Sequence, residues 1–600
     1  MGLVVRWGKP VRTSRIYLLA ALLTATLGLT ANTSHAQTPY TWKNTDPNTD
    51  WATSANWSPT GSDWTVTGGT AIFEKVSSSS LVNPNVVGTL FTDGITIDNS
   101  GSGKYNITGS GTLDLGAGGL AVSDGNTTIT ADLFLSASQT WNIGSGSTVE
   151  HSGILGGTGG PTLTVQGGGT VNLTGTANTF AGSVSVTGAG TTLNLSAGGT
   201  SYAGFTVDGG TLSLGGPIST GVLLNDGNLI LNSGSALTFT GRDNNNAING
   251  PGNLFIEGMG TVVTLTNDHT FNGPITIGSG ATFQLGNGSS SASFVDEGSI
   301  AKIDNAGTLI FNQADNPTYA INGTGNLVKD GEDTLIFGDA KTYTGATTII
   351  AGTLQLDGDG YISQSGTITV GTTIVTTATL SIPGSYTIGS DTAVPQTLQG
   401  SGAVTGGDLT VSSSTIRGGS PGVLGTLTIA GNLNLARADG FALPTLRVEV
   451  SRTDTSGPGT ADASKISVTN GGNLTTSSKL IIDVISGSNG TTVLAPGKYY
   501  TLTLANVEGT ITLNGFTYPD NAVTTVPTGD YELTSSTGLN FDEVSLTVDT
   551  TGTEALLMLD FKVVPVPEPA AVLGIGFGAL ALGGLVRRRV RKPTDLVAKA

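Results

Sequence analysis

Short segments in which apolar and polar residues alternate recur along most of the chain, and no sustained 3.6-residue helical pattern is found between residues 37 and 563. Period-two alternation indicates half-buried strands, and Asp-Gly, Gly-Gly and Asn-Gly turn signals separate the segments. The sequence therefore predicts an all-β chain. Examples of these segments are Thr-Leu-Thr-Val at 162–165, Thr-Val-Asn-Leu-Thr at 170–174, Asn-Leu-Ile-Leu-Asn at 228–232 and Gly-Thr-Leu-Gln-Leu at 352–356.

Internal repetition favours a solenoid over a sandwich. In each copy of a longer unit an aromatic residue (Phe180, Phe271 or Tyr343) lies two residues before a Gly, and two strand-like segments follow. Such a unit cannot bury its apolar face alone, so neighbouring units must stack as a parallel β-helix. The aromatic residues are 91 and then 72 residues apart, which predicts insertions between coils. The three copies are VNLTGTANTFAGSVSVTGAGTTLNL (171–195), VTLTNDHTFNGPITIGSGATFQL (263–285) and LIFGDAKTYTGATTIIAGTLQL (335–356). A shorter Gly-Thr-Leu-x-apolar pattern begins at Gly111, Gly210, Gly307, Gly352 and Gly425.

These units resemble the autotransporter-associated β-strand repeat. The best match is residues 335–356 with the lead-in 322–334, and residues 418–435 are similar to the stretch that often follows such repeats. The resemblance implies a right-handed parallel β-helix (β-solenoid) on an exported protein, and it implies no catalytic residue. An autotransporter would continue into an outer-membrane barrel, and we expect this chain to lack one.

The first 36 residues have the pattern of a signal peptide. Four basic residues precede an apolar segment at 16–29, and Ser34-His35-Ala36 forms a small-x-small cleavage site. We therefore expect cleavage between Ala36 and Gln37.

The C-terminal region contains a second targeting pattern. Residues 570–586 are 17 uncharged residues, which as a helix would span about 25 Å, near the lower limit for crossing a membrane. A basic flank follows, and it predicts that the acidic body lies on the exported side. The basic flank consists of Arg587, Arg588, Arg589, Arg591 and Lys592.

Pro567, Glu568 and Pro569 immediately precede this apolar segment. Pro-Glu-Pro, an apolar helix and an arginine cluster, in that order, resemble the PEP-CTERM sorting signal. The resemblance implies an exosortase-type processing enzyme as a partner, transient insertion of residues 570–586 in the inner membrane of a Gram-negative bacterium, and transfer to the cell surface or an exopolysaccharide-containing matrix. Residues 590–600 extend further than the usual ending of such signals.

Charge excludes some partners. Residues 37–569 hold 15 basic and 42 acidic residues, a formal charge of −27. Such a body is repelled by nucleic acid, so we expect no nucleic-acid partner.

Residue types that bind zinc are scarce. The chain has no Cys, and only His151 and His269 remain after signal cleavage, so a zinc site is not expected. His269 takes the Asn position of the repeat's Asn-Thr-Phe, which suggests a turn residue.

Acidic residues are mostly single and precede Gly, as in Asp124-Gly125, Asp226-Gly227 and Asp330-Gly331, where Asp is usually a turn residue. Asp357 and Asp359 are the densest pair, yet they lack the ligand spacing of an EF-hand, so any Ca²⁺ binding there would be weak. We expect no catalytic residue, no metal and no cofactor.

Four tryptophans, at positions 42, 51, 57 and 64, lie near the mature N-terminus. They either stack against sugar rings or form a cap over the open end of the solenoid, and we favour the cap because large rings shield exposed strand edges.

The sequence thus predicts a signal peptide (1–36), a Trp-rich cap with the first coils (37–110), β-helix repeats (111–435), a C-terminal β-rich region that caps the solenoid (436–563), a sorting signal with one transmembrane helix (564–592) and a tail (593–600). The function that we expect is that of a non-enzymatic structural or adhesion-type protein of the cell surface or matrix. The alternative is a β-helical carbohydrate-active enzyme or carbohydrate-binding protein.

Overall fold

The computed structural model describes residues 38–564 except for 44–48, 62, 66–68, 76–80, 102–103, 196–200, 215–218, 226–227, 232–235, 240–247, 295–301, 373–375, 390–394, 439, 452–458, 461, 487–493, 495–498 and 536–539. This part of the chain contains strands and one short 3₁₀ turn, η1 (Ser54–Asn56), and no α-helix. The prediction of an all-β chain is confirmed.

The strands form four sheets. The first contains β1 (Pro39–Trp42), β2 (Trp57–Ser58), β3 (Thr70–Phe73), β6 (Thr89–Asp98), β8 (Thr112–Asp124), β10 (Asp132–Leu135), β11 (Gln139–Ile143), β13 (Leu155–Gly157), β14 (Thr162–Gln166), β16 (Ser183–Thr187), β18 (Ser201–Asp208), β20 (Ser219–Asn225), β23 (Ile248–Gly250), β26 (Asn267–Phe271) and β29 (Ala292–Phe294). The second contains β4 (Leu81–Val82), β5 (Asn85–Val86), β7 (Lys104–Gly109), β9 (Asn126–Ile129), β12 (Thr148–His151), β15 (Thr170–Leu173), β17 (Thr192–Leu195), β19 (Thr211–Leu214), β21 (Asn228–Leu231), β24 (Asn253–Ile256), β27 (Ile275–Ile277), β30 (Lys302–Asn305) and β32 (Ala320–Asn322).

The other two sheets occupy the later coils. The third contains β22 (Ala236–Phe239), β25 (Val262–Leu265), β28 (Thr282–Leu285), β31 (Thr308–Phe311), β33 (Asn326–Lys329), β35 (Thr347–Ile349), β37 (Thr367–Val370), β39 (Thr397–Gly400), β41 (Thr415–Ile416), β44 (Thr445–Ser451), β46 (Asp462–Ala463), β49 (Leu480–Ser486) and β54 (Tyr531–Thr534). The fourth contains β34 (Thr334–Phe337), β36 (Thr353–Leu356), β38 (Thr379–Ile388), β40 (Ala403–Ser412), β42 (Thr426–Ala430), β43 (Leu433–Ala436), β45 (Gly459–Thr460), β47 (Lys465–Thr469), β48 (Leu474–Thr476), β50 (Tyr499–Val507), β51 (Ile511–Leu513), β52 (Phe516–Thr517), β53 (Val523–Thr525), β55 (Asn540–Asp549) and β56 (Ala555–Val564).

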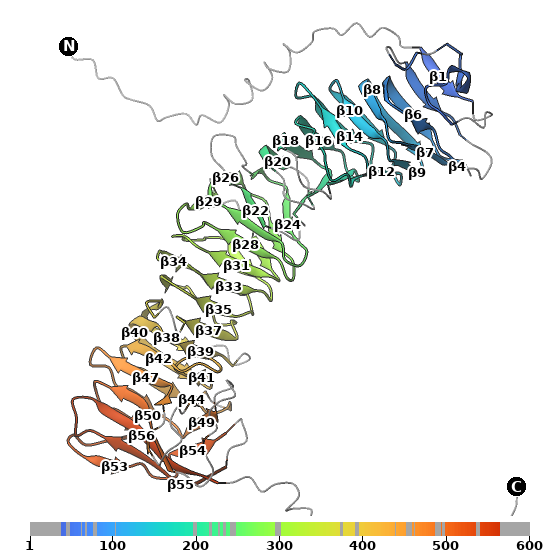
Figure 1. Cartoon of the computed structure of the whole chain (residues 1–600). Helices are drawn as coiled ribbons and strands as arrows, with labels where there is room; N and C mark the ends of the chain where they lie inside the picture. Colours follow the sequence, from blue (N-terminus) through green and yellow to red (C-terminus); the bar gives the residue numbers. More distant parts are fainter. Residues whose placement is uncertain are drawn as a thin grey trace, which may run out of the picture.

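The chain winds from sheet to sheet as a β-solenoid. In the middle coils β24, β25 and β26 belong to the second, third and first sheets in turn, and each pairs in parallel with strands of the neighbouring coils. Figure 1 shows the result, a long curved stack with β1 at one end and β53 and β55 at the other. The number of residues in a coil varies, as predicted. Leu212 pairs with Leu229, 17 residues later in the sequence, whereas Ile482 pairs with Leu533, 51 residues later.

The fourth sheet continues from the first. Between them lies a coil in which the Gln313 side chain bonds both backbone groups of Ala292 in β29. Asp315, two residues later, bridges to Leu335 in β34. The stack therefore remains continuous where the first sheet ends, although no regular strand occupies this position among the described residues.

Alternation decides which side chains point inward. In β36, Leu354 and Leu356 are buried whereas Thr353 and Gln355 are half-buried, as the sequence pattern predicts. The three repeat aromatics, Phe180, Phe271 and Tyr343, are also buried in the interior.

The three repeat copies lie on different sheets. The two strands that follow the aromatic residue are β16 and β17 in the first copy, on the first and second sheets. They are β27 and β28 in the second copy, on the second and third sheets, and β35 and β36 in the third copy, on the third and fourth. Because every face is a parallel sheet with the same inward and outward alternation, one unit fits any of them.

Side-chain amides connect successive coils at one turn of the fourth sheet. Asn432 donates to Asp408 through its backbone N–H (3.1 Å) and its amide (3.0 Å), and Asn473 donates to Asn432 in the same two ways (2.9 and 3.1 Å). Thr510 then donates its backbone N–H and hydroxyl to Asn473 (2.8 and 2.9 Å). This ladder satisfies turn N–H groups that the strand pairing leaves unpaired.

The two ends differ from the coils between them. At the N-terminal end Trp42, Trp51, Trp57 and Trp64 are buried and pack with Phe73, with ring centroids 4.7 to 6.0 Å apart. At the C-terminal end β50, β56, β55 and β53 pair antiparallel, so the parallel stacking stops there.

Replacing Leu354 by Asp should destabilise the protein by several kcal/mol, because an unpaired carboxylate would enter the apolar interior. Gln355→Asp, on the outward side of the same strand, is the matched control and should change the free energy of unfolding by less than about 1 kcal/mol. Urea unfolding followed by circular dichroism measures both. Equal stability of the two variants would contradict the inward assignment.

Candidate functional sites

The targeting residues predicted from the sequence lie outside the described residues. These are the cleavage pair Ala36 and Gln37, the motif Pro567, Glu568 and Pro569, and the basic flank Arg587, Arg588, Arg589, Arg591 and Lys592. The predicted span 570–586 also lies outside them, and within the described ranges no helix has the length and apolar character needed to cross a membrane. The signal peptide and the sorting tail therefore remain predictions.

The tryptophan cluster does not offer a stacking surface for sugars. Trp51 and Trp57 have no exposed area, and Trp64 is 1 % exposed. The indole N–H of Trp57 donates to the carbonyl of Trp51 at 2.8 Å, which fixes the two rings against each other. Rings packed in this way shield the end of the stack from water rather than contact a ligand.

A polar residue lies two positions before the aromatic in each repeat copy, and in each case it bonds to the preceding coil. Asn178 Oδ1 accepts from the N–H of Leu155 at 2.8 Å. His269 Nδ1 accepts from the N–H of Ile248 at 3.0 Å. Lys341 instead donates through Nζ, as described next. We call this position the polar slot.

Lys341 Nζ donates to the carbonyls of Pro317 (2.9 Å) and Tyr319 (3.0 Å), and it pairs with Asp339. All three slot residues are buried, Asn178 at 4 %, His269 at 0 % and Lys341 at 1 % exposed. The prediction that His269 is a turn residue is wrong, because it lies inside β26. The repeat pattern located this position in the sequence. The alternation of apolar and polar residues around it did not predict that its polar side chain points into the interior.

The other histidine, His151, is also buried. Its Nε2 lies 3.1 Å from the carbonyl oxygen of Ala131, and a carbonyl only accepts, so Nε2 carries the proton. Burial lowers the pKa of His151 to about 4, against the opposing effects of the bond to Ala131 and of Asp132. The imidazole is therefore neutral at pH 7 and has no access to a substrate.

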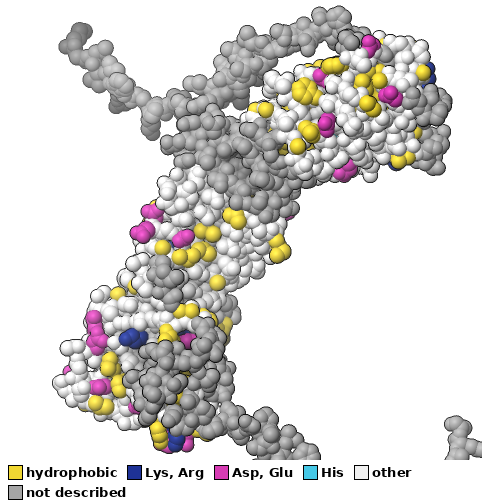
Figure 2. Space-filling model, viewed as in Figure 1, with side chains coloured by type: hydrophobic (Ala, Val, Ile, Leu, Met, Phe, Trp, Pro, Cys, Tyr) yellow, Lys and Arg dark blue, Asp and Glu magenta, His cyan; other side chains and the backbone are white. Residues whose placement is uncertain are grey.

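Two of the Asp-Gly pairs have a structural role. Asp330 Oδ1 accepts from the N–H of Gly331 at 2.8 Å, and Asp357 Oδ1 accepts from the N–H of Gly358 at 2.9 Å. Asp357 and Asp359 are exposed, and the described residues contain no cluster of three or more His, Asp or Glu that could hold a metal ion. Asp226 and Gly227 lie outside the described residues. Figure 2 shows acidic side chains scattered over the visible face rather than gathered in a groove.

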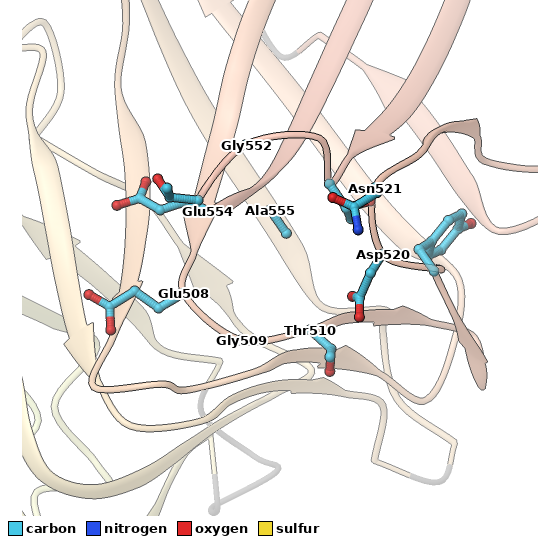
Figure 3. Close-up of a pocket in the computed structure, with 11 residues that line it drawn as sticks. Glu508, Gly509, Thr510, Asp520, Asn521, Gly552, Glu554 and Ala555 are labelled. Carbon is cyan, nitrogen blue, oxygen red and sulfur yellow. The ribbon is translucent and has the colours of Figure 1, made fainter.

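A pocket of about 260 Å³ opens at the C-terminal end of the solenoid. Glu508 and Glu554 lie on one side of it, and Asp520 and Asn521 lie on the other, with Asp520 pointing toward Thr510 (Figure 3). No Lys, Arg or His is among its lining residues, so the pocket is acidic and has no cationic partner for an anionic substrate. Glu508 also accepts from the N–H of Gly471 at 2.9 Å, which gives it a structural role.

A buried ion pair that the sequence did not predict lies over the third sheet. Arg417 Nη2 and Glu449 Oε2 are 2.6 Å apart, and both side chains are at most 3 % exposed. Glu449 Oε1 also accepts from the N–H of Gly422 at 3.1 Å, which ties the turn after β41 to β44. Burial lowers the pKa of Arg417, and the Glu449 carboxylate opposes that shift. The partners are 32 residues apart, so no local pattern joins them.

Comparison with known proteins identifies the repeat. A family model described as passenger-associated-transport-repeat matches residues 163–191 and 327–356. These two segments contain the first and third polar slots with their aromatic residues. No curated protein and no solved structure matches the chain. Passenger-type repeats imply an exported, surface-displayed protein, as the sequence predicts.

Replacing Glu449 by Gln should lower the free energy of unfolding by about 3 kcal/mol, because a buried guanidinium would lose its counter-charge. The matched control is Glu532→Gln, which removes a pair with Lys479 whose side chains are 50 % and 38 % exposed. The control should change stability by less than about 1 kcal/mol. Chemical unfolding of both variants measures the difference. Equal losses of unfolding free energy would show that the buried pair stabilises the protein no more than the exposed pair does.

Acid should destabilise the protein through His151. In the unfolded chain this residue protonates near its ordinary pKa of about 6.5, whereas the folded pKa is about 4. The folded state resists protonation, so the full stability is present above about pH 6.5 and falls by about 3 kcal/mol as pH drops to about 4. His151→Gln should lose this part of the pH dependence. Unfolding free energies of both proteins, measured from pH 7 to pH 4, test this, and parallel curves would contradict it.

Proposed function

We propose that the chain is a non-enzymatic structural or adhesion-type protein of the cell surface or extracellular matrix. The observation that carries the proposal is the combination of a long solenoid with passenger-type repeats and the absence, among the described residues, of a metal cluster. Its described histidines are buried, and the carboxylates of Asp330 and Asp357 cap their own turns. An elongated stack of this kind offers a long continuous surface for contact.

Delivery in this proposal depends on two signals. The signal peptide directs export, and the Pro567-Glu568-Pro569 motif with the apolar segment and the basic flank retains the precursor in the inner membrane of a Gram-negative cell. An exosortase-type enzyme then cleaves near the motif and releases the body toward the surface. The resemblance to the sorting signal implies exopolysaccharide as a neighbour there. The strongly acidic body disfavours anionic lipid surfaces and nucleic acid.

The proposed cleavage motif lies close in sequence to the last strand of the folded body. β56 ends at Val564, three residues before Pro567. Three extended residues reach about 11 Å at most. The processing enzyme would therefore act beside the antiparallel strands β55 and β56.

A carbohydrate-active role is the second candidate, and the acidic pocket at the C-terminal end is the observation that favours it. Glycoside hydrolysis needs two carboxylates that face each other across the scissile bond. The pocket supplies Glu508, Asp520 and Glu554. Glu508 is already engaged by Gly471, so we rank this function second.

Replacing Pro567, Glu568 and Pro569 together by Ala should leave uncleaved precursor in the inner membrane. The control replaces Pro593, Thr594 and Asp595 by Ala, which changes three residues beyond the basic flank and should leave processing intact. Cell fractionation with intact-mass analysis measures both outcomes. Surface-located native protein that still carries the peptide Pro-Thr-Asp-Leu-Val-Ala-Lys (593–599) would contradict processing and leave a permanent anchor.

A further inference from the structure

The three occupants of the polar slot respond differently to acid. Asn178 does not titrate, so its bond to Leu155 is independent of pH. Lys341 bonds to Pro317 and Tyr319 as a donor, so added protons take no acceptor from this link. His269 is the exception, because it links the coils through an unprotonated ring nitrogen.

Geometry defines the state of that ring. The N–H of Ile248 donates to His269 Nδ1 at 3.0 Å, and a backbone N–H cannot accept. Nδ1 is therefore unprotonated, and the neutral imidazole carries its hydrogen on Nε2. The side chain has no exposed area, so water cannot replace the bond without local opening.

We propose that His269 is an acid-sensitive clamp between the coils that contain β23 and β26. Protonation places a hydrogen on Nδ1 and turns the acceptor into a donor that faces the N–H of Ile248. Two donors cannot bond, so the clamp opens and leaves a buried charge beside it. The proposal is independent of the delivery route proposed above.

The strands that flank β26 are β23, with Ile248, Asn249 and Gly250, and β29, with Ala292, Ser293 and Phe294, and none of these residues is titratable. Asp268 is the charged neighbour within β26 itself. His151 behaves differently, since its Nε2 donates to a carbonyl and keeps that bond when the ring is protonated.

The position of the clamp gives its opening a structural consequence. β23, β26 and β29 are the last three strands of the first sheet, and β22, close by in sequence, begins the third. These strands lie in the middle of the stack (Figure 1). Opening there would loosen the junction between the early and the late coils and expose unpaired strand edges midway along the molecule.

Hydrogen exchange of the full-length His151→Gln variant tests the clamp at residue level, because this background removes the acid destabilisation that His151 contributes. Between about pH 7.5 and about pH 4.5, the protection factor of the Ile248 amide should fall by about tenfold or more, the effect of one lost buried hydrogen bond. Protection factors are used because they correct for the pH dependence of chemical exchange. The Leu155 amide, bonded to Asn178 in the first copy, is the internal reference and should stay protected.

His269→Asn is the matched variant, because it introduces the residue that the first copy uses at this slot. Ile248 should then be equally protected at both pH values. The His269→Asn substitution is made in the same His151→Gln background. Loss of protection at Ile248 in the double variant at acidic pH, or an Ile248 amide in the His151→Gln parent that stays protected at pH 4.5, would overturn the proposal. If the double variant exchanges faster at every pH, the profile of the parent alone decides, with Leu155 as its reference.

Discussion

Backbone hydrogen bonding between successive coils is the interaction on which this molecule depends. One coil exposes both edges of each short strand and buries little apolar area by itself, so it is stable only between two neighbours. The pairing of Leu163 with Val184 and of Val171 with Leu193 shows how the register keeps aliphatic residues in columns inside the stack. Because pairing involves backbone atoms, coil length can vary widely without disturbing those columns.

A stack of coils has two ends, and the strands there have no further coil to pair with. The chain covers one end with four packed tryptophans and turns the other into antiparallel strands, β50, β56, β55 and β53. Polar turns pose a related problem within the stack. The ladder from Asp408 to Thr510 and the polar slots meet it by connecting one coil to the next through side chains.

The polar slot shows how one geometric role can be met by different chemistry. Asn178 and His269 accept a hydrogen bond from the preceding coil, and Lys341 donates two. What the position requires is a side chain that reaches backward and satisfies buried backbone groups, since an unpaired buried group is costly. The choice among the three then decides whether the junction responds to pH.

Strand alternation, turn residues and the repeated unit are local properties, and they predicted the all-β class, the stacked coils and the inward side of β36 from the sequence alone. Those predictions succeed because period-two alternation directly states which side chains share a face. The tertiary structure decided what depends on distant partners: the inward direction of His269, the pairing of Arg417 with Glu449, and the shift of each repeat copy to another sheet. A charged or polar residue bears no local mark of the partner that buries it, because that partner is brought near only when the coils stack.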